Sequence, residues 1–195
     1  MKSIELYFYG PLKFDGNNNS LFNNELINKS GIYLWTIFCE DKYYIEYIGE
    51  TGQSFYKRNK EHLIQVLGGN YRVLNLESLK YGKVEIFWNG MWRKGHRDKM
   101  NEFINSYLDF APKLYDYITS INVFIAPLDC ETHIRKRIEG AIAKNLKEQS
   151  YEINKFFPKD VKYLGKKRES KSDDVIKVNI YSSIAILGLP NIIYA

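Results

Sequence analysis

The hydrophobic pattern between residues 31 and 49 predicts a β-hairpin. The runs GIYLWTIF and YYIEYIG are both dense in β-branched and aromatic residues, and the polar segment CEDK separates them. Two such runs on either side of a short polar segment are typical of neighbouring antiparallel strands. A four-residue connection sets Tyr33 within about one residue of directly opposite Tyr47, so we expect the two side chains to be neighbours across the strands.

Helical periodicity follows the hairpin. The run Phe55–Leu67 predicts a helix that carries Arg58 and His62 one turn apart on one face. Residues 121–128 (INVFIAPL) predict a buried strand, and a second helix is expected from about residue 131 to 148. The apolar positions of this second helix recur at helical spacing and form a core-facing stripe. They are Ile134, Ile138, Ala141, Ile142 and Leu146, and Glu139 lies at their border.

The ends and the middle of the chain are more irregular. Residues 1–30 contain a short strand and a loop rich in turn-forming residues, and we interpret them as an N-terminal extension. Residues 68–120 hold a strand-like run, 83–88, and a helical stretch expected to break near Pro112, and we interpret them as an insertion. Residues 155–195 pass from a lysine-rich polar stretch to strand-like apolar character, and we interpret them as a C-terminal extension.

These elements predict one decorated domain over residues 1–195, with its core over residues 31–154. The order of strand hairpin, helix, strand and helix is typical of an α/β or α+β fold. We therefore expect a small mixed or antiparallel three-stranded sheet flanked by helices, to which the helical insertion and the two terminal extensions are added.

Composition excludes several classes of protein. Hydrophobic residues make up 45% and charged residues 26% of the chain, which excludes a disordered, collagen-like or membrane-spanning protein. The first twenty residues lack the apolar run of a secretory signal, so a cytoplasmic protein is expected. Cys39 and Cys130 stand outside any Cys-x-x-Cys or Cys/His spacing, which argues against a disulfide framework and a structural zinc site. We expect both to be ordinary thiols.

Charge favours a polyanionic partner. Lysine and arginine exceed aspartate and glutamate by 28 to 23, which gives a formal net charge of +5. Four basic clusters are candidates for contacts with phosphate groups. They are Arg93-Lys94, Arg97 with Lys99, Arg135-Lys136-Arg137 and Lys166-Lys167-Arg168.

The two arms of the predicted hairpin carry an ordered pair of tripeptides. Gly31-Ile32-Tyr33 stands on the first arm and Tyr47-Ile48-Gly49 on the second; Arg58 and His62 follow on the next helix and Glu139 on a later one. Over about residues 31–154 the chain therefore resembles the GIY-YIG nuclease family. The resemblance implies a divalent-metal-dependent endonuclease that hydrolyses phosphodiester bonds of DNA, most simply double-stranded DNA, and that is restriction-like or associated with a mobile element.

The resemblance also assigns roles. Tyr33 is expected to be the base that deprotonates the attacking water, with Tyr47 as its partner. Arg58 is expected to hold a non-bridging phosphate oxygen and to lower the pKa of a phenol, whose ordinary value is about 10. His62 is expected to hydrogen-bond either a tyrosine or the phosphate. Glu139 matches the glutamate that binds one Mg²⁺ or Mn²⁺ ion per active site.

Three further residues are weaker candidates for substrate binding. Lys42 is a cation in the turn of the hairpin, Arg93 lies in the insertion beside Trp92, and Asn154 follows Glu139 at the distance at which the family often carries an asparagine. Because each chain carries one site, a double-strand break requires a homodimer or two sequential nicks. A protein partner that supplies sequence specificity is also compatible with the resemblance, and abundant Asn, Lys and Ile fit a prokaryotic or phage genome.

Each candidate also has an ordinary structural interpretation. The tyrosines could be core residues of an aromatic-rich sheet, Arg58 and His62 could lie on a solvated helix face, and Glu139 could form a surface ion pair with a neighbouring basic residue. The alternative function is a catalytically silent nucleic-acid-binding module that keeps the fold. It predicts salt-sensitive binding without metal-dependent cleavage.

Overall fold

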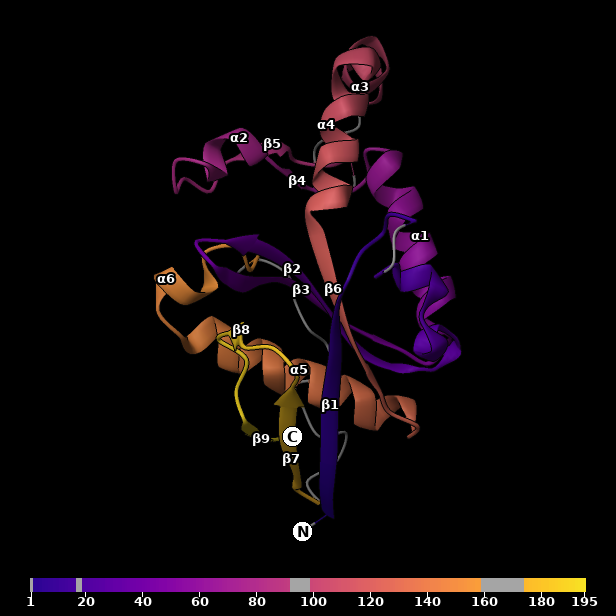
Figure 1. The fold of residues 1–195 in the computed structure, drawn as a ribbon, viewed down its shortest axis with the longest axis vertical. Coiled ribbons are helices and arrows are strands. Elements are labelled where there is room, and N and C mark those ends of the chain that lie inside the picture. The colour runs from indigo at the N-terminus through magenta and orange to yellow at the C-terminus, as the bar shows by residue number, and fades with distance from the viewer. Residues whose placement is uncertain (1, 17–18, 92–98, 159–173) are drawn as a thin grey trace. The chain divides into compact units, whose positions relative to one another are not determined.

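The computed structural model describes residues 2–16, 19–91, 99–158 and 174–195 (Figure 1). They form two compact units. The sheet unit comprises Met1–Tyr56 and Asn122–Ala195, and the helical unit comprises Lys57–Ile121. Helix α1 (Phe55–Leu67) begins in the sheet unit and continues into the helical unit. The single decorated domain with an insertion over residues 68–120 stays a prediction.

The class of the fold is α+β, and its main sheet is larger than predicted. In the described residues the sheet has seven strands in the order β8-β3-β2-β6-β1-β7-β9. They are β1 (Lys2–Leu12), β2 (Gly31–Cys39), β3 (Lys42–Thr51), β6 (Ile121–Pro127), β7 (Ile176–Ser182), β8 (Ile186–Leu187) and β9 (Ile192–Tyr194). The prediction of three strands is wrong because both ends of the chain add strands to this sheet. β1 pairs with β7 in parallel, from Lys2 opposite Ile176 to Phe8 opposite Ser182.

The predicted hairpin is confirmed as β2 and β3. Its turn residues Glu40 and Asp41 have φ values of 51° and 57°, as in a type I′ turn, and the turn pairs Cys39 with Lys42. One residue of β3, Glu46, is extra, because Thr36 pairs with Ile45 whereas Trp35 pairs with Tyr47. The ladder therefore contains a β-bulge.

Helix α5 (Thr132–Glu148) covers one face of the sheet and confirms the predicted apolar stripe. Ile138, Ile142 and Leu146 are buried in the main core cluster, and Ile134 and Ala141 pack against it from partly buried positions. The sheet contributes alternate residues to this cluster, as expected for strands with one face toward the core. They include Leu6, Phe8, Ile32, Leu34, Ile45, Ile48, Val178 and Ile180. The short helix α6 (Tyr151–Asn154) follows α5, and two 3₁₀ turns, Leu21–Asn23 and Glu25–Asn28, precede β2.

The helical unit is built around aromatic side chains. Besides α1 it contains β4 (Val73–Leu74), α2 (Leu76–Leu79), β5 (Ile86–Trp88), α3 (Lys99–Asn105) and α4 (Tyr107–Ser120). The Trp88 ring lies 5.2 Å from that of Phe110 and 5.7 Å from that of Phe103, and its Nε1 donates to the Gly69 carbonyl at 2.6 Å. These contacts fix β5 against α3 and α4.

Two predictions in this unit are corrected. The strand expected over residues 83–88 is limited to Ile86–Trp88, and the helical stretch breaks at Ser106 instead of near Pro112. Pro112 lies inside α4, where it deprives the carbonyl of Leu108 of a helical donor. Both side chains are exposed, so water can reach that carbonyl. Within the described ranges, no helix is long and apolar enough to cross a membrane.

Candidate active site

The bulge at Glu46 sets the two motif tyrosines on one face of the hairpin. An unbroken ladder from the turn would place Tyr33 opposite Ile48, and Tyr47 would then project from the other face. With the extra residue, Tyr33 pairs with Gly49 and Trp35 with Tyr47. Tyr33 and Tyr47 are thus diagonal neighbours, and their ring centroids lie 6.0 Å apart. The predicted proximity is confirmed, but the expected register, within one residue of directly opposite, is wrong by one further residue.

The glycines of the two tripeptides are needed for close packing. A Cβ on Gly49 would lie 2.7 Å from Cε1 of Tyr33 and still closer to its Cζ and hydroxyl oxygen, so the ring lies flat over this glycine. Gly31 has a φ of 153° and approaches β6 so closely that a Cβ would overlap the Ala126 carbonyl and lie 2.7 Å from the Leu128 nitrogen. Glycine is therefore required at both positions by neighbours that are far away in the sequence.

The two phenols differ in burial. Tyr33 is fully buried, and its ring meets that of Phe55, the first residue of α1, edge-on at 6.4 Å. Tyr47 is half-buried and lies against Trp35, with ring centroids 6.0 Å apart. Water therefore reaches Tyr47 more readily than Tyr33.

The expected metal ligand, Glu139, lies beside the end of β3. Its Oε1 accepts a hydrogen bond from the backbone N–H of Glu50 at 3.1 Å, next to Gly49 in the sequence. Arg135, one turn earlier on α5, is buried and donates through Nε to Oε2 of Glu50 at 3.2 Å. It also donates to the Thr132 hydroxyl at 2.9 Å and to the Cys130 carbonyl. This network ties the N-terminal half of α5 to the strand that carries the second tripeptide.

The chemistry of Glu139 fits one hard cation with few protein ligands. Its half-exposed carboxylate supplies oxygen donors, and Mg²⁺ is usually held by one or two carboxylates while several waters remain bound. Throughout the described part of the chain, no three His, Cys, Asp or Glu side chains come together as a potential metal site. An ion at Glu139 would therefore depend on water or a bound ligand for most of its coordination.

Arg58 and His62 form a polar group in the helical unit. Arg58 is partly exposed and contacts Oε2 of Glu61 at 3.4 Å. His62 is buried; this burial, followed by the charge of Arg58, lowers its pKa to about 3, so the imidazole is neutral at pH 7. Its Nδ1 lies 3.1 Å from the hydroxyl of Tyr71, a residue that no motif in the sequence indicated. Burial raises the pKa of Tyr71, and the charge of Arg58 opposes that rise.

The weaker candidates lie elsewhere. Lys42 is exposed at the turn and stands five residues before Tyr47, about 17 Å along the strand. Asn154 is buried, and its amide donates to the carbonyls of Leu146 at 2.9 Å and Gln149 at 3.0 Å, which closes the end of α5. Arg93 lies outside the described residues.

The basic cluster at residues 135–137 contributes less surface charge than predicted. Arg135 and Arg137 are buried, which leaves Lys136 as the exposed residue of its cluster. Clusters 93–94 and 166–168, and Arg97 of the cluster with Lys99, fall outside the part of the chain that the structure describes. Neither buried arginine is therefore available to neutralise a phosphate group.

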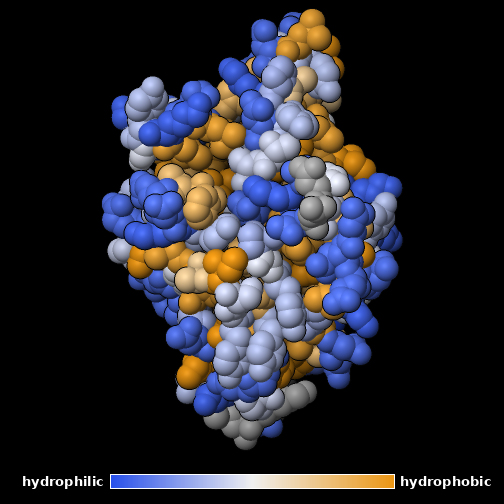
Figure 2. Space-filling model, viewed as in Figure 1, coloured by the Kyte–Doolittle hydropathy of each residue, from blue (hydrophilic) through white to orange (hydrophobic). Residues whose placement is uncertain are grey.

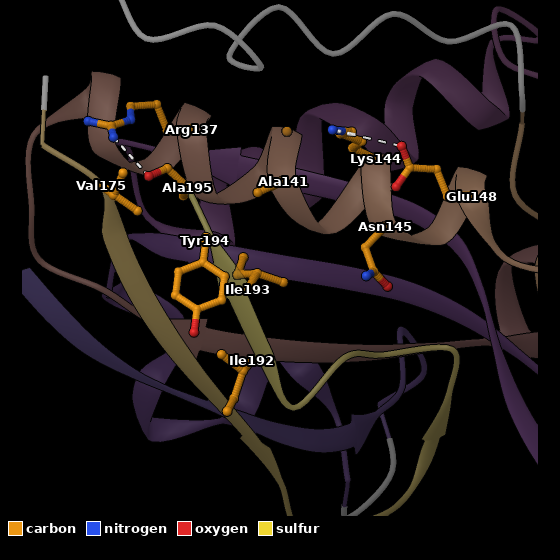
Figure 3. A pocket seen from close by; sticks show the side chains of 11 residues that line it. Arg137, Ala141, Lys144, Asn145, Glu148, Val175, Ile192, Ile193, Tyr194 and Ala195 are labelled. Carbon is orange, nitrogen blue, oxygen red and sulfur yellow. Dashed lines mark hydrogen bonds and ion pairs between the residues drawn. The ribbon is translucent and has the colours of Figure 1, made fainter. Parts of the chain in front are cut away.

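A pocket between α5 and the C-terminal strands involves a different set of residues (Figure 3). Arg137 lies at one end and donates through Nη2 to the carbonyls of Asp174 at 2.7 Å and Ala195 at 2.9 Å. Lys144 and Glu148 form a 3.8 Å ion pair on the neighbouring turns of α5. None of the predicted site residues lines this pocket, and its arginine serves to hold β7 and β9 against the helix.

Comparisons with protein-family models, with curated proteins and with solved structures give no match. The function is therefore inferred from the residues of the chain and their geometry. In the sheet unit these are Tyr33, Tyr47 and Glu139, with Gly49 and Glu50 between them. In the helical unit they are the cluster formed by Arg58, His62 and Tyr71.

Proposed function

We propose that this chain is a divalent-metal-dependent DNA endonuclease of the GIY-YIG type, restriction-like or associated with a mobile element. One observation carries the proposal: the bulge at Glu46 sets the phenols of Tyr33 and Tyr47 on one face of one hairpin, with ring centroids 6.0 Å apart. If Tyr33 and Tyr47 served only as core residues, the fold would not require both of them to come from the two motif tripeptides.

Hydrolysis of a phosphodiester requires an oriented, deprotonated water and compensation for the charge that develops on the phosphate oxygens. The half-buried Tyr47 is suited to meet that water, and the fully buried Tyr33 is suited to position Tyr47. This division of labour reverses the roles that the sequence suggested. A phenol with an ordinary pKa of about 10 needs a nearby cation to act as a base at neutral pH.

In this proposal Arg58 and His62 also have roles in catalysis. Arg58 supplies a permanent charge and a planar set of donors for a non-bridging oxygen. The lowered pKa of His62, about 3, means that its contribution is a hydrogen bond from a neutral ring and not a charge. Tyr71 then fixes the orientation of that ring through Nδ1.

Glu139 would hold the metal ion through a carboxylate that is already oriented by the Glu50 N–H. The ion, when bound, supplies Lewis-acid stabilisation of the phosphate and of the departing oxygen. The Arg135–Glu50 ion pair keeps that N–H in place, so Arg135 is expected to act as a positioning residue.

Cleavage of supercoiled plasmid and of single-stranded DNA with Mg²⁺, Mn²⁺ or EDTA tests the proposal. We expect metal-dependent nicking or linearisation that falls at least about 100-fold in Tyr47→Phe, Arg58→Lys and Glu139→Gln. If these groups act as one unit, the double variant Tyr47→Phe/Arg58→Lys will lose little more than either single variant.

The matched controls are Glu148→Gln, on the same helix as Glu139, and Tyr81→Phe, at a phenol that is 80% exposed, and both should cleave like the wild type. Circular dichroism checks that each variant is folded. Salt-sensitive DNA binding without cleavage under any metal condition would contradict the nuclease and favour the silent binding module. Cleavage that survives Glu139→Gln unchanged would contradict the assigned metal ligand.

A further inference from the structure

Within the described residues of the sheet unit, one face of the sheet along β1, β7 and β9 carries exposed side chains. Alternate residues of these strands, among them Leu6, Phe8, Val178, Ile180 and Ile193, enter the core that α5 covers. Figure 1 shows α5 behind β1 and β7, so the view looks onto the other face. The residues of that other face, here called the tyrosine face, are Ser3, Glu5, Tyr7, Tyr9, Lys177, Asn179, Tyr181, Ile192 and Tyr194.

The tyrosine face exposes an unusual amount of aromatic surface. The four tyrosines are 48% (Tyr7), 47% (Tyr9), 45% (Tyr181) and 63% (Tyr194) exposed. At about 200 Å² for a fully exposed ring, they present about 400 Å² together. Figure 2 shows the residues over β1 and β7 in the pale colours of intermediate hydropathy. Surface patches of this size are often functional.

Two of the four rings pack on each other within the single chain. Tyr7 and Tyr181 stack with centroids 4.7 Å apart and an interplanar angle of 16°. Asn179 donates to Glu5 at 2.7 Å; this hydrogen bond and one from Tyr181 lower the pKa of the Glu5 carboxyl. Ordered tyrosines lose little conformational entropy on binding, which is why tyrosine is enriched in protein interfaces.

Charge distinguishes between the two kinds of partner that would use such a surface. The face carries one carboxylate, Glu5, and one ammonium group, Lys177, and is neutral overall, although the whole chain has a net charge of +5. A nucleic acid needs several cations to neutralise its phosphates, and this face offers one. Glu5 and Lys177 interact within the chain, and in a second copy each can also meet its opposite, because a two-fold interface brings residue i of one copy to residue j of the other.

We propose that the tyrosine face is the interface of a homodimer with two-fold symmetry, in which Glu5 of each copy pairs with Lys177 of the other. The aromatic area alone is about half of the roughly 800 Å² that each partner contributes to a stable interface, and the polar residues around it supply a rim. This inference is independent of the proposed nuclease activity, because it is carried by the surface of β1, β7 and β9.

Sedimentation velocity over a range of concentrations up to about 100 µM tests the dimer. We expect the wild type to dimerise and Tyr7→Ser/Tyr181→Ser to raise the dissociation constant of the dimer at least tenfold. The control Tyr81→Ser/Tyr115→Ser replaces two exposed tyrosines of the helical unit and should leave the dissociation constant unchanged. The charge pair gives a sharper readout. Glu5→Lys alone and Lys177→Glu alone should each dissociate the dimer, and the double exchange Glu5→Lys/Lys177→Glu should restore it.

Three results would overturn the proposal. The first is a wild type that stays monomeric over the whole range. The second is a dimer that the face variants do not weaken, since another surface would then hold it. The third is a monomer whose affinity for an oligothymidine probe falls in Tyr7→Ser/Tyr181→Ser, because the face would then be a platform for stacked bases.

Discussion

Replacement of Gly49 by alanine tests the packing on which the paired tyrosines depend. An added Cβ would lie 2.7 Å from Cε1 of Tyr33 and closer to the end of the ring. The ring cannot move freely, because Tyr33 is fully buried and contacts Phe55 and Tyr47. The backbone at Gly49 itself has a conformation that alanine adopts without strain, so the space above it decides the outcome.

The magnitude follows from two opposing effects. At a position with free space, glycine to alanine in a strand stabilises a protein by about 0.4–1 kcal/mol, because the unfolded chain loses freedom. Overpacking of a well-packed core costs about 1–3 kcal/mol. With two ring carbons and the hydroxyl oxygen of Tyr33 within 3 Å of the new carbon, we expect a net loss of about 2 kcal/mol in the free energy of unfolding. For a chain of this size that loss lowers Tm by about 4–8 °C.

Urea and thermal unfolding followed by circular dichroism measure the effect. Gly16→Ala is the control, since nothing lies within 4 Å of a Cβ at Gly16. A double-mutant cycle isolates the contact: in a Tyr33→Val background the ring is gone, and Gly49→Ala should become neutral or stabilising, with a coupling energy of at least about 1 kcal/mol. A neutral or stabilising Gly49→Ala in the wild-type background would refute the packing of Tyr33 on Gly49.

Three other predictions follow from buried polar groups. The pKa of His62 falls from 6.5 in the unfolded chain to about 3 in the folded one, so the unfolded chain binds the proton more tightly and stability is expected to decrease as pH falls. The expected loss is about 2 kcal/mol between pH 7 and pH 5. Urea unfolding at the two pH values measures it, and His62→Gln should remove this dependence. Arg135→Gln leaves the largely buried Glu50 carboxylate without its ion pair and should lower the free energy of unfolding by about 3 kcal/mol. The double variant Arg135→Gln/Glu50→Gln should recover part of this loss in the same assay. Asn154→Ala leaves two carbonyls at the end of α5 without their donor and should cost about 1–3 kcal/mol, while Asn101→Ala, at an exposed position, should change the unfolding midpoint little.

Local patterns were sufficient to predict the hairpin, α1, β6 and α5. In each of them the signal is local: a continuous run of β-branched and aromatic residues in the strands, and an apolar stripe such as that from Ile134 to Leu146 in the helix. The size of the sheet could not be predicted in this way. β1 pairs with β7 across more than 170 residues, and nothing within either strand specifies that partner.

The site was predictable only where a motif named its residues. Tyr33, Tyr47, Arg58, His62 and Glu139 were expected in the two tripeptides and on the helices, and each lies on the element predicted for it. Tyr71, which contacts His62, lies in an irregular segment after α1, where no periodicity applies. Asn154 shows the opposite case, since its spacing from Glu139 suggested a ligand and its amide instead caps α5.

The bulge at Glu46 links the stability of the fold to the geometry of the site. Ile45 and Ile48 are three residues apart, and in a regular strand they would project from opposite faces. Both are buried in the same core cluster, where each contributes about 1.5–3 kcal/mol. Only an extra residue between them satisfies both, and that residue also moves Tyr47 to the face of Tyr33. The apolar spacing of β3 is therefore a signal in the sequence for the bulge, and the burial of Ile45 and Ile48 favours the register that sets the two phenols on one face.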